Sequence, residues 1–144
     1  MNQDNILSQS KVIYKCDYLL KDINIDDYDF LIIPGGKAVF NDLDKPIVEE
    51  IVNSFVKRNK LIAAICAAPL IFGRLGILEG KNATCYPGFE GELKGANCTA
   101  EGVVKAGNII TGKGPGKSPE FAFAIVASLL GEAKANEISS AMQY

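Results

Sequence analysis

Cys66 is the residue whose surroundings in the sequence best suit nucleophilic chemistry. Ala64 and Ala68 stand two positions before and after it, between an apolar run that predicts a buried strand and a segment that predicts a helix. Small residues flank the nucleophile in the strand-to-helix elbow of hydrolases, because the backbone turns there too sharply for larger side chains. The amino end of the following helix favours the thiolate form of a cysteine. The same pattern fits a small buried cysteine without reactivity equally well.

Two glycine-containing loops accompany this elbow. Residues 34–36, Pro-Gly-Gly, end another apolar run, and loops that follow parallel strands meet at one edge of a sheet. The N–H groups of Gly35 and Gly36 are therefore candidate donors to an oxyanion or a bound carbonyl, although the loop alone fits a simple turn better. Residues 111–118 resemble a phosphate-binding loop. Thr111 stands where that motif needs glycine, and Pro115 removes an N–H group, so we predict no nucleotide site.

Histidine is absent from the 144 residues, which excludes Cys-His and Ser-His dyads and histidine-ligated metal sites. The four cysteines form no C-x-x-C pair, so we expect free thiols and no bound metal. For three of them a core or surface thiol is the better interpretation: Cys16, Cys85 and Cys98. Tyr86 follows an expected strand, which allows either a place in the cleft beside the elbow or an ordinary half-buried position.

Composition excludes several other classes of protein. The chain is 48% hydrophobic and 22% charged, which is typical of a folded soluble domain rather than a disordered one. Its net charge of −2 comes from interspersed charges, so we expect no nucleic-acid partner. Residues 61–73, the longest apolar stretch, contain Pro69 and are too short to span a membrane. The polar residues 1–11 fit neither a signal nor a transit peptide, so we expect a cytoplasmic protein.

The elements expected around the elbow alternate between strands and helices. We predict one domain over residues 1–144, with residues 1–11 as a poorly ordered or edge segment. The strands are expected at 12–17, 29–34, 61–65 and 82–85, with a hairpin at 103–111; the helices are expected from Pro46 to about 57–60 and at 67–73, 118–130 and 132–142. This alternation predicts an α/β fold with a mostly parallel sheet.

Four segments together resemble the DJ-1/PfpI (ThiJ/PfpI) superfamily, in its DJ-1-like branch: residues 29–36, 62–69, 83–90 and 114–122. The resemblance implies a flavodoxin-like three-layer α/β sandwich of the class I glutamine amidotransferase type, shortened at the N-terminus, and commonly a homodimer. Cys66 matches the oxidisable elbow cysteine of that family, and Gly36 and Ala67 match its backbone oxyanion donors. Five residues match the cleft of that family: Tyr86, Pro87, Gly114, Pro115 and Gly116. Tyr86 stands where several members of the family carry histidine.

The implied function is action on reactive 2-oxoaldehydes such as methylglyoxal, or on early glycation adducts, as a glyoxalase- or deglycase-like enzyme without metal or cofactor. The alternatives are a non-enzymatic thiol redox sensor or chaperone-like stress protein, or an inactive truncated member. Family members carry a glutamate that hydrogen-bonds the cysteine, in an opening strand-helix unit that has no counterpart here. Glu90 and Glu120 are the acidic residues nearest to the motifs, and no physical argument from sequence directs either toward Cys66.

Overall fold

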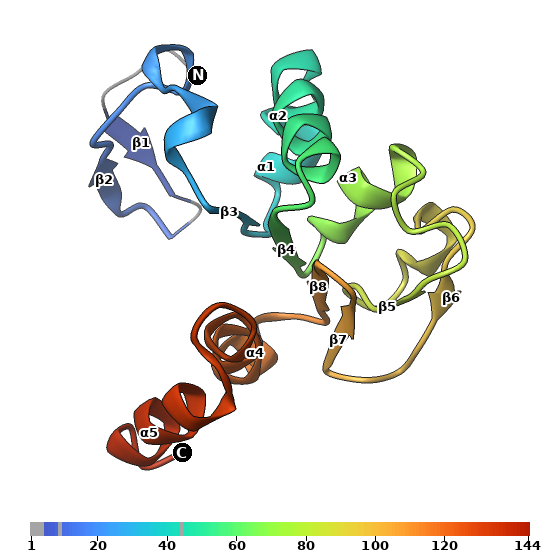
Figure 1. The fold of residues 1–144 in the computed structure, drawn as a ribbon. Coiled ribbons are helices and arrows are strands. Elements are labelled where there is room, and N and C mark those ends of the chain that lie inside the picture. Colours follow the sequence, from blue (N-terminus) through green and yellow to red (C-terminus); the bar gives the residue numbers. More distant parts are fainter. Residues whose placement is uncertain (1–4, 9, 44) are drawn as a thin grey trace.

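A four-stranded sheet forms the centre of the chain in the computed structural model, which describes residues 5–8, 10–43 and 45–144 (Figure 1). The strand order is β3 (Phe30–Ile33), β4 (Leu61–Ile65), β8 (Ile109–Gly112) and β7 (Val103–Ala106). β3, β4 and β8 run parallel, and β7 pairs antiparallel with β8. The predicted α/β fold with a mostly parallel sheet is confirmed.

Helices cover both faces of this sheet. Figure 1 shows α2 (Pro46–Lys57) and α4 (Ser118–Leu130) on opposite sides of the strands. Ile62 and Ala64 of β4 lie in one apolar cluster with residues of α2, whereas Leu61 and Ala63 lie in a second cluster with residues of α4. Neighbouring residues of β4 thus point to opposite faces, so a strand buried on both sides needs a continuous apolar sequence.

The remaining helices are short or lie at the ends of these layers. They are α1 (Ala38–Asn41), α3 (Pro69–Arg74), α5 (Glu132–Ala141) and the 3-10 turns η1 (Leu20–Asp22), η2 (Ile25–Asp27), η3 (Glu90–Glu92) and η4 (Pro115–Lys117). α5 packs on α4, and α3 follows directly after the elbow. No helix in the three described ranges is long and apolar enough to cross a membrane.

The strand predicted at residues 82–85 is shorter than expected and does not join the main sheet. β5 contains only Asn82–Ala83 and pairs in parallel with β6 (Asn97–Cys98), in a two-stranded sheet of its own. The next residue, Thr84, donates its N–H to the Thr111 hydroxyl (3.0 Å) and its own hydroxyl to the Glu101 carbonyl (2.9 Å). These side-chain bonds replace a strand ladder beyond Ala83.

A hairpin of β1 (Asn5–Leu7) and β2 (Ile13–Lys15) precedes the main sheet. Residues 1–4 and 9, part of the predicted edge segment 1–11, lie outside the described residues. β2 falls within the strand predicted at 12–17. The single domain over residues 1–144 stays a prediction.

Candidate active site

Cys66 occupies a strained turn immediately after β4. Its φ is 67°, in the left-handed region that side-chain-bearing residues rarely adopt, at a cost of about 1–2 kcal/mol. Two backbone hydrogen bonds hold it there: its N–H donates to the Gly112 carbonyl (2.9 Å), and its carbonyl accepts from the Tyr86 N–H (2.8 Å). A strained residue that is fixed from both sides is typical of functional sites. The sharp turn predicted around Cys66 is therefore present.

The loop after β3 packs directly against this turn. A Cβ atom built on Gly35 would lie 2.5 Å from the Cys66 Cβ and 3.1 Å from its Sγ, so only glycine fits between them. Gly36 follows with a φ of 97°, and its carbonyl accepts the Val39 N–H at the start of α1. The structure thus brings the glycine loop to the cysteine. Donation by the N–H groups of Gly35 and Gly36 to an oxyanion stays a prediction.

Ala67 and Ala68 continue the chain from the elbow into α3, and both are buried. The Ala68 N–H donates to the Ile65 carbonyl (3.2 Å), which closes the turn around Cys66. Such burial explains why small residues stand here, because larger side chains would have to displace core atoms. The role of the Ala67 N–H as an oxyanion donor also stays a prediction.

Tyr86 lies beside the elbow, since its N–H bonds to Cys66, and its side chain is 44% exposed. Its ring would be 3.4 Å from a Cβ on Gly114, so Gly114 forms a wall behind it. The Tyr86 and Phe89 ring centroids are 6.4 Å apart, and those of Phe89 and Phe40 are 5.4 Å apart. Phe40 and Phe89 could not be recognised from the sequence, because the row of three rings forms only when distant segments fold together.

The other predicted pocket residues lie farther along these loops. Pro115 and Gly116 begin the exposed turn η4 after Gly114. Pro87 lines a separate cavity of about 270 Å³ together with Cys85, Glu90 and Cys98. Their contribution to a substrate pocket at Cys66 stays a prediction.

The four cysteines are free thiols in different environments. Cys85 is buried, and this burial, reinforced by the nearby Glu90 carboxylate, raises the pKa of its thiol to about 12. Cys85 is therefore almost entirely protonated and unreactive near neutral pH. Cys98 is exposed, whereas Cys16 and Cys66 are partly exposed. Within residues 5–8, 10–43 and 45–144, no group of three or more histidine, cysteine or acidic side chains could hold a metal ion.

Both acidic residues considered as proton shuttles have other partners. The Glu90 carboxylate accepts the Gly88 N–H (2.8 Å) within its own turn. The Glu120 carboxylate accepts a hydrogen bond from Lys117 Nζ (2.6 Å), which lowers the pKa of Glu120 to about 2. Glu120 therefore stays ionised at neutral pH, which makes it a poor proton donor.

The sequence matches the DJ-1/PfpI family over residues 1–128. The chain belongs to this family. It is 42% identical to protein DJ-1 homolog B of Arabidopsis thaliana over 127 residues, which are 85% of this chain and 29% of the relative. It is 37% identical to protein DJ-1alpha of Drosophila melanogaster over 143 residues, which are 95% of this chain and 64% of that protein. The chain thus spans less than two thirds of these relatives' own length.

Solved structures of the family have the same fold. Drosophila melanogaster DJ-1beta superimposes with a TM-score of 0.87 and 31% identity, over 97% of this chain and 77% of that one. Oxidized Toxoplasma gondii DJ-1 superimposes with a TM-score of 0.92 and 27% identity, over 100% of this chain and 79% of that one.

Two relatives carry names that state an activity. A glutathione-independent glyoxalase of Caenorhabditis elegans is 35% identical over 124 residues, which are 85% of this chain and 66% of that protein. A deglycase of Pyrococcus abyssi is 30% identical over 102 residues, which are 69% of this chain and 61% of that protein.

Proposed function

We propose that Cys66 is the nucleophile of a glyoxalase- or deglycase-like reaction on reactive 2-oxoaldehydes or their early glycation adducts. The observation that carries the proposal is the left-handed turn at Cys66, held by bonds to Gly112 and Tyr86 and packed against Gly35. The names of two relatives, a glyoxalase and a deglycase, support this substrate class.

In this proposal the Cys66 thiolate adds to the aldehyde carbon of methylglyoxal and forms a carbon–sulfur bond. The carbonyl oxygen becomes an oxyanion, which the N–H groups of Gly36 and Ala67 stabilise until protonation gives a hemithioacetal. The aldehyde carbon then loses its proton, and the neighbouring carbon gains one, which leaves a lactate thioester on Cys66. Water hydrolyses this thioester to lactate and restores the thiol. All of these steps balance without an external oxidant or reductant.

The proton transfers of this reaction need a general acid or base, and neither acidic residue considered above is free to act as one. Glu90 and Glu120 have other partners, as described above. A general acid or base contributes about 10²–10⁴-fold to a rate, so we expect residues 1–144 on their own to form lactate that much more slowly than an enzyme with such a group beside its nucleophile. Formation of the hemithioacetal needs only the thiolate and the N–H donors, and we expect it to persist.

The test combines two measurements on one sample. Methylglyoxal should protect Cys66 from labelling by iodoacetamide, which peptide mapping detects. In the same sample lactate should accumulate slowly, which an enzymatic assay detects. Cys66→Ser should abolish lactate formation, whereas Cys98→Ser, which removes an exposed thiol, should leave both lactate formation and the protection of Cys66 unchanged. Equal lactate formation by Cys66→Ser and the unaltered chain would refute the nucleophile assignment.

A redox-sensing role is the second candidate, because the partly exposed Cys66 thiol is accessible to peroxide and a relative has been solved in oxidized form. Oxidation to sulfenic or sulfinic acid would add oxygen to Cys66 and not to the buried Cys85. Limiting peroxide with peptide mapping tests this role, and oxidation of Cys85 before Cys66 would contradict it. The homodimer that the resemblance implies stays a prediction, which sedimentation tests.

A further inference from the structure

Three aromatic rings beside the elbow take no part in the steps proposed for Cys66. Phe40, Phe89 and Tyr86 form an aromatic row, in which the centroids of neighbouring rings are 5.4 Å and 6.4 Å apart. Both distances fall within the range of about 4.5–7 Å that paired aromatic rings favour. The row is therefore a set of packed rings.

The backbone connects both ends of this row to the loops that flank the thiol. At one end the Tyr86 N–H donates to the Cys66 carbonyl (2.8 Å), and the Phe89 N–H donates to the Tyr86 carbonyl (3.3 Å). At the other end Phe40 lies in α1, four positions after Gly36 of the glycine loop. The contact between Phe40 and Phe89 therefore joins the two segments that meet beside Cys66.

The middle ring is fixed by the core, whereas the outer two keep free surface. Phe89 is partly buried and packs against the apolar cluster that contains α2. Phe40 and Tyr86 are 42% and 44% exposed, and Gly114 lies behind the Tyr86 ring. Aromatic surface that is held in place and still exposed can pack against a further ring.

The addition of an aldehyde to Cys66 determines which part of a substrate reaches these rings. In a 2-oxoaldehyde the sulfur bonds to the aldehyde carbon and the oxyanion turns toward the backbone N–H groups, so the substituent on the ketone carbon extends away from the thiol. Gly35 packs against one side of Cys66, and Ala67 is buried below it. The side with exposed surface is that of Tyr86. A methyl substituent offers little area to the row there, whereas an aryl ring offers a flat face.

We propose that the aromatic row holds the aryl group of an arylglyoxal, so that the substrates of Cys66 are 2-oxoaldehydes with an aromatic substituent. This inference rests on the nucleophile proposed above. The covalent step is unchanged: the thiolate forms a carbon–sulfur bond with the aldehyde carbon, the carbonyl oxygen takes the electron pair and then a proton, and the ketone stays intact. The ring gains from buried area and from ring pairing, so we expect a preference of about tenfold over a methyl group.

The probes are phenylglyoxal and methylglyoxal. The quantity measured is the concentration of each aldehyde that halves the labelling of Cys66 by iodoacetamide, divided by its dissociation constant for the hemithioacetal with glutathione. This ratio corrects for the different reactivities of the two aldehydes. Mapping uses chymotrypsin, because phenylglyoxal also modifies arginine and would block trypsin. Phe40→Leu should reduce the preference for phenylglyoxal by about threefold or more, whereas Phe40→Tyr, which keeps a ring, should retain it.

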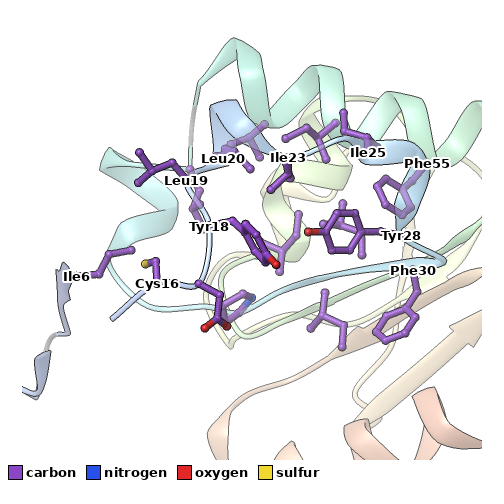
Figure 2. A pocket seen from close by; sticks show the side chains of 18 residues that line it. Ile6, Cys16, Tyr18, Leu19, Leu20, Ile23, Ile25, Tyr28, Phe30 and Phe55 are labelled. Atoms are coloured by element: carbon purple, nitrogen blue, oxygen red, sulfur yellow. The ribbon is translucent and has the colours of Figure 1, made fainter. Parts of the chain in front are cut away.

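Tyr28→Leu is the matched control, because Tyr28 is 40% exposed but lines a separate cavity of about 450 Å³ beside β3 (Figure 2). Cys66 and the three rings of the row are not among the residues that line that cavity. This variant should change the preference by less than about twofold. Methylglyoxal is an internal control in every variant, since a distorted elbow would weaken protection by both aldehydes.

The possible failures are distinguishable. If neither aldehyde protects Cys66, the proposed function is refuted and this inference with it. Protection by methylglyoxal without a preference for phenylglyoxal would overturn this inference alone, and so would equal losses in Tyr28→Leu and Phe40→Leu. Cyclohexylglyoxal has a saturated ring of similar size, and a preference equal to that for phenylglyoxal would refute the aromatic substrate class. A preference that disappears as the protein concentration rises would make a second copy of the chain the occupant of the row.

Discussion

Replacing Gly35 by alanine tests how closely the glycine loop packs against the elbow. The new Cβ would lie 2.5 Å from the Cys66 Cβ and 2.8 Å from the Ile65 carbonyl oxygen, both below the 3.0 Å that Cβ contacts essentially never cross. The contacts are with the start of a side chain and with backbone, neither of which can swing aside. The loop or the elbow must therefore move.

The size of the effect follows from two opposing contributions. Overpacking in a well-packed region costs about 1–3 kcal/mol. Alanine also restricts the unfolded chain more than glycine, which stabilises the folded state by about 0.4–1 kcal/mol. We therefore expect Gly35→Ala to lower the free energy of unfolding by about 1–2 kcal/mol. Gly91→Ala is the matched control, because a Cβ there meets nothing within 4 Å and its φ is not left-handed.

Urea unfolding, monitored by circular dichroism, gives the free energy of unfolding of both variants. Gly91→Ala should be slightly more stable than the unaltered chain, and the gap between the two variants should be about 2 kcal/mol. Labelling of Cys66 by iodoacetamide should slow in Gly35→Ala, since the added Cβ would lie 3.1 Å from Sγ. If Gly35→Ala matches Gly91→Ala in stability and keeps its labelling rate, the close packing of this loop against Cys66 is refuted.

Two further predictions concern strain and charge. Cys66→Gly should be more stable than Cys66→Ala by about 1 kcal/mol, because alanine keeps the strain of a φ near 67° and glycine does not; equal urea midpoints for the two variants would contradict a strained elbow. The pKa of Glu120, held near 2 by Lys117, lies below its ordinary value of 4.5, so its contribution to stability is present above pH 4.5 and is lost as the pH falls toward 2. Thermal melting between these pH values should therefore depend on pH less in Glu120→Gln than in the unaltered chain, and parallel curves would refute the ion-pair argument.

Local patterns were sufficient to predict the elements that build the elbow. The apolar spacing of α2, the continuous apolar sequence of β4 and the small residues around Cys66 are each visible within a few positions. The end of β5 was not predictable in this way, because the bond from Thr84 to the Thr111 hydroxyl joins residues 27 positions apart. The aromatic row of Phe40, Phe89 and Tyr86 depends on the same kind of distant contact.

The exposure of β3 shows a different limit of sequence reasoning. Its four apolar residues predict a buried strand, as those of β4 do. Whether such a strand is covered depends on where the helices end, and α4 packs over β4, β8 and β7. Phe30 and Ile32 are therefore partly exposed because of the arrangement of other elements, which their own sequence does not encode.

β3 positions the glycine loop of the cysteine site. Pro34 lines the cavity beside this strand, and the next residue, Gly35, packs against Cys66. Gly35, Cys66 and Gly112 all stand at the carboxyl ends of neighbouring parallel strands, so the elbow is built from loops whose positions those strands determine. The register of β3, β4 and β8 therefore determines both that Gly35 packs against Cys66 and that the Gly112 carbonyl accepts the Cys66 N–H.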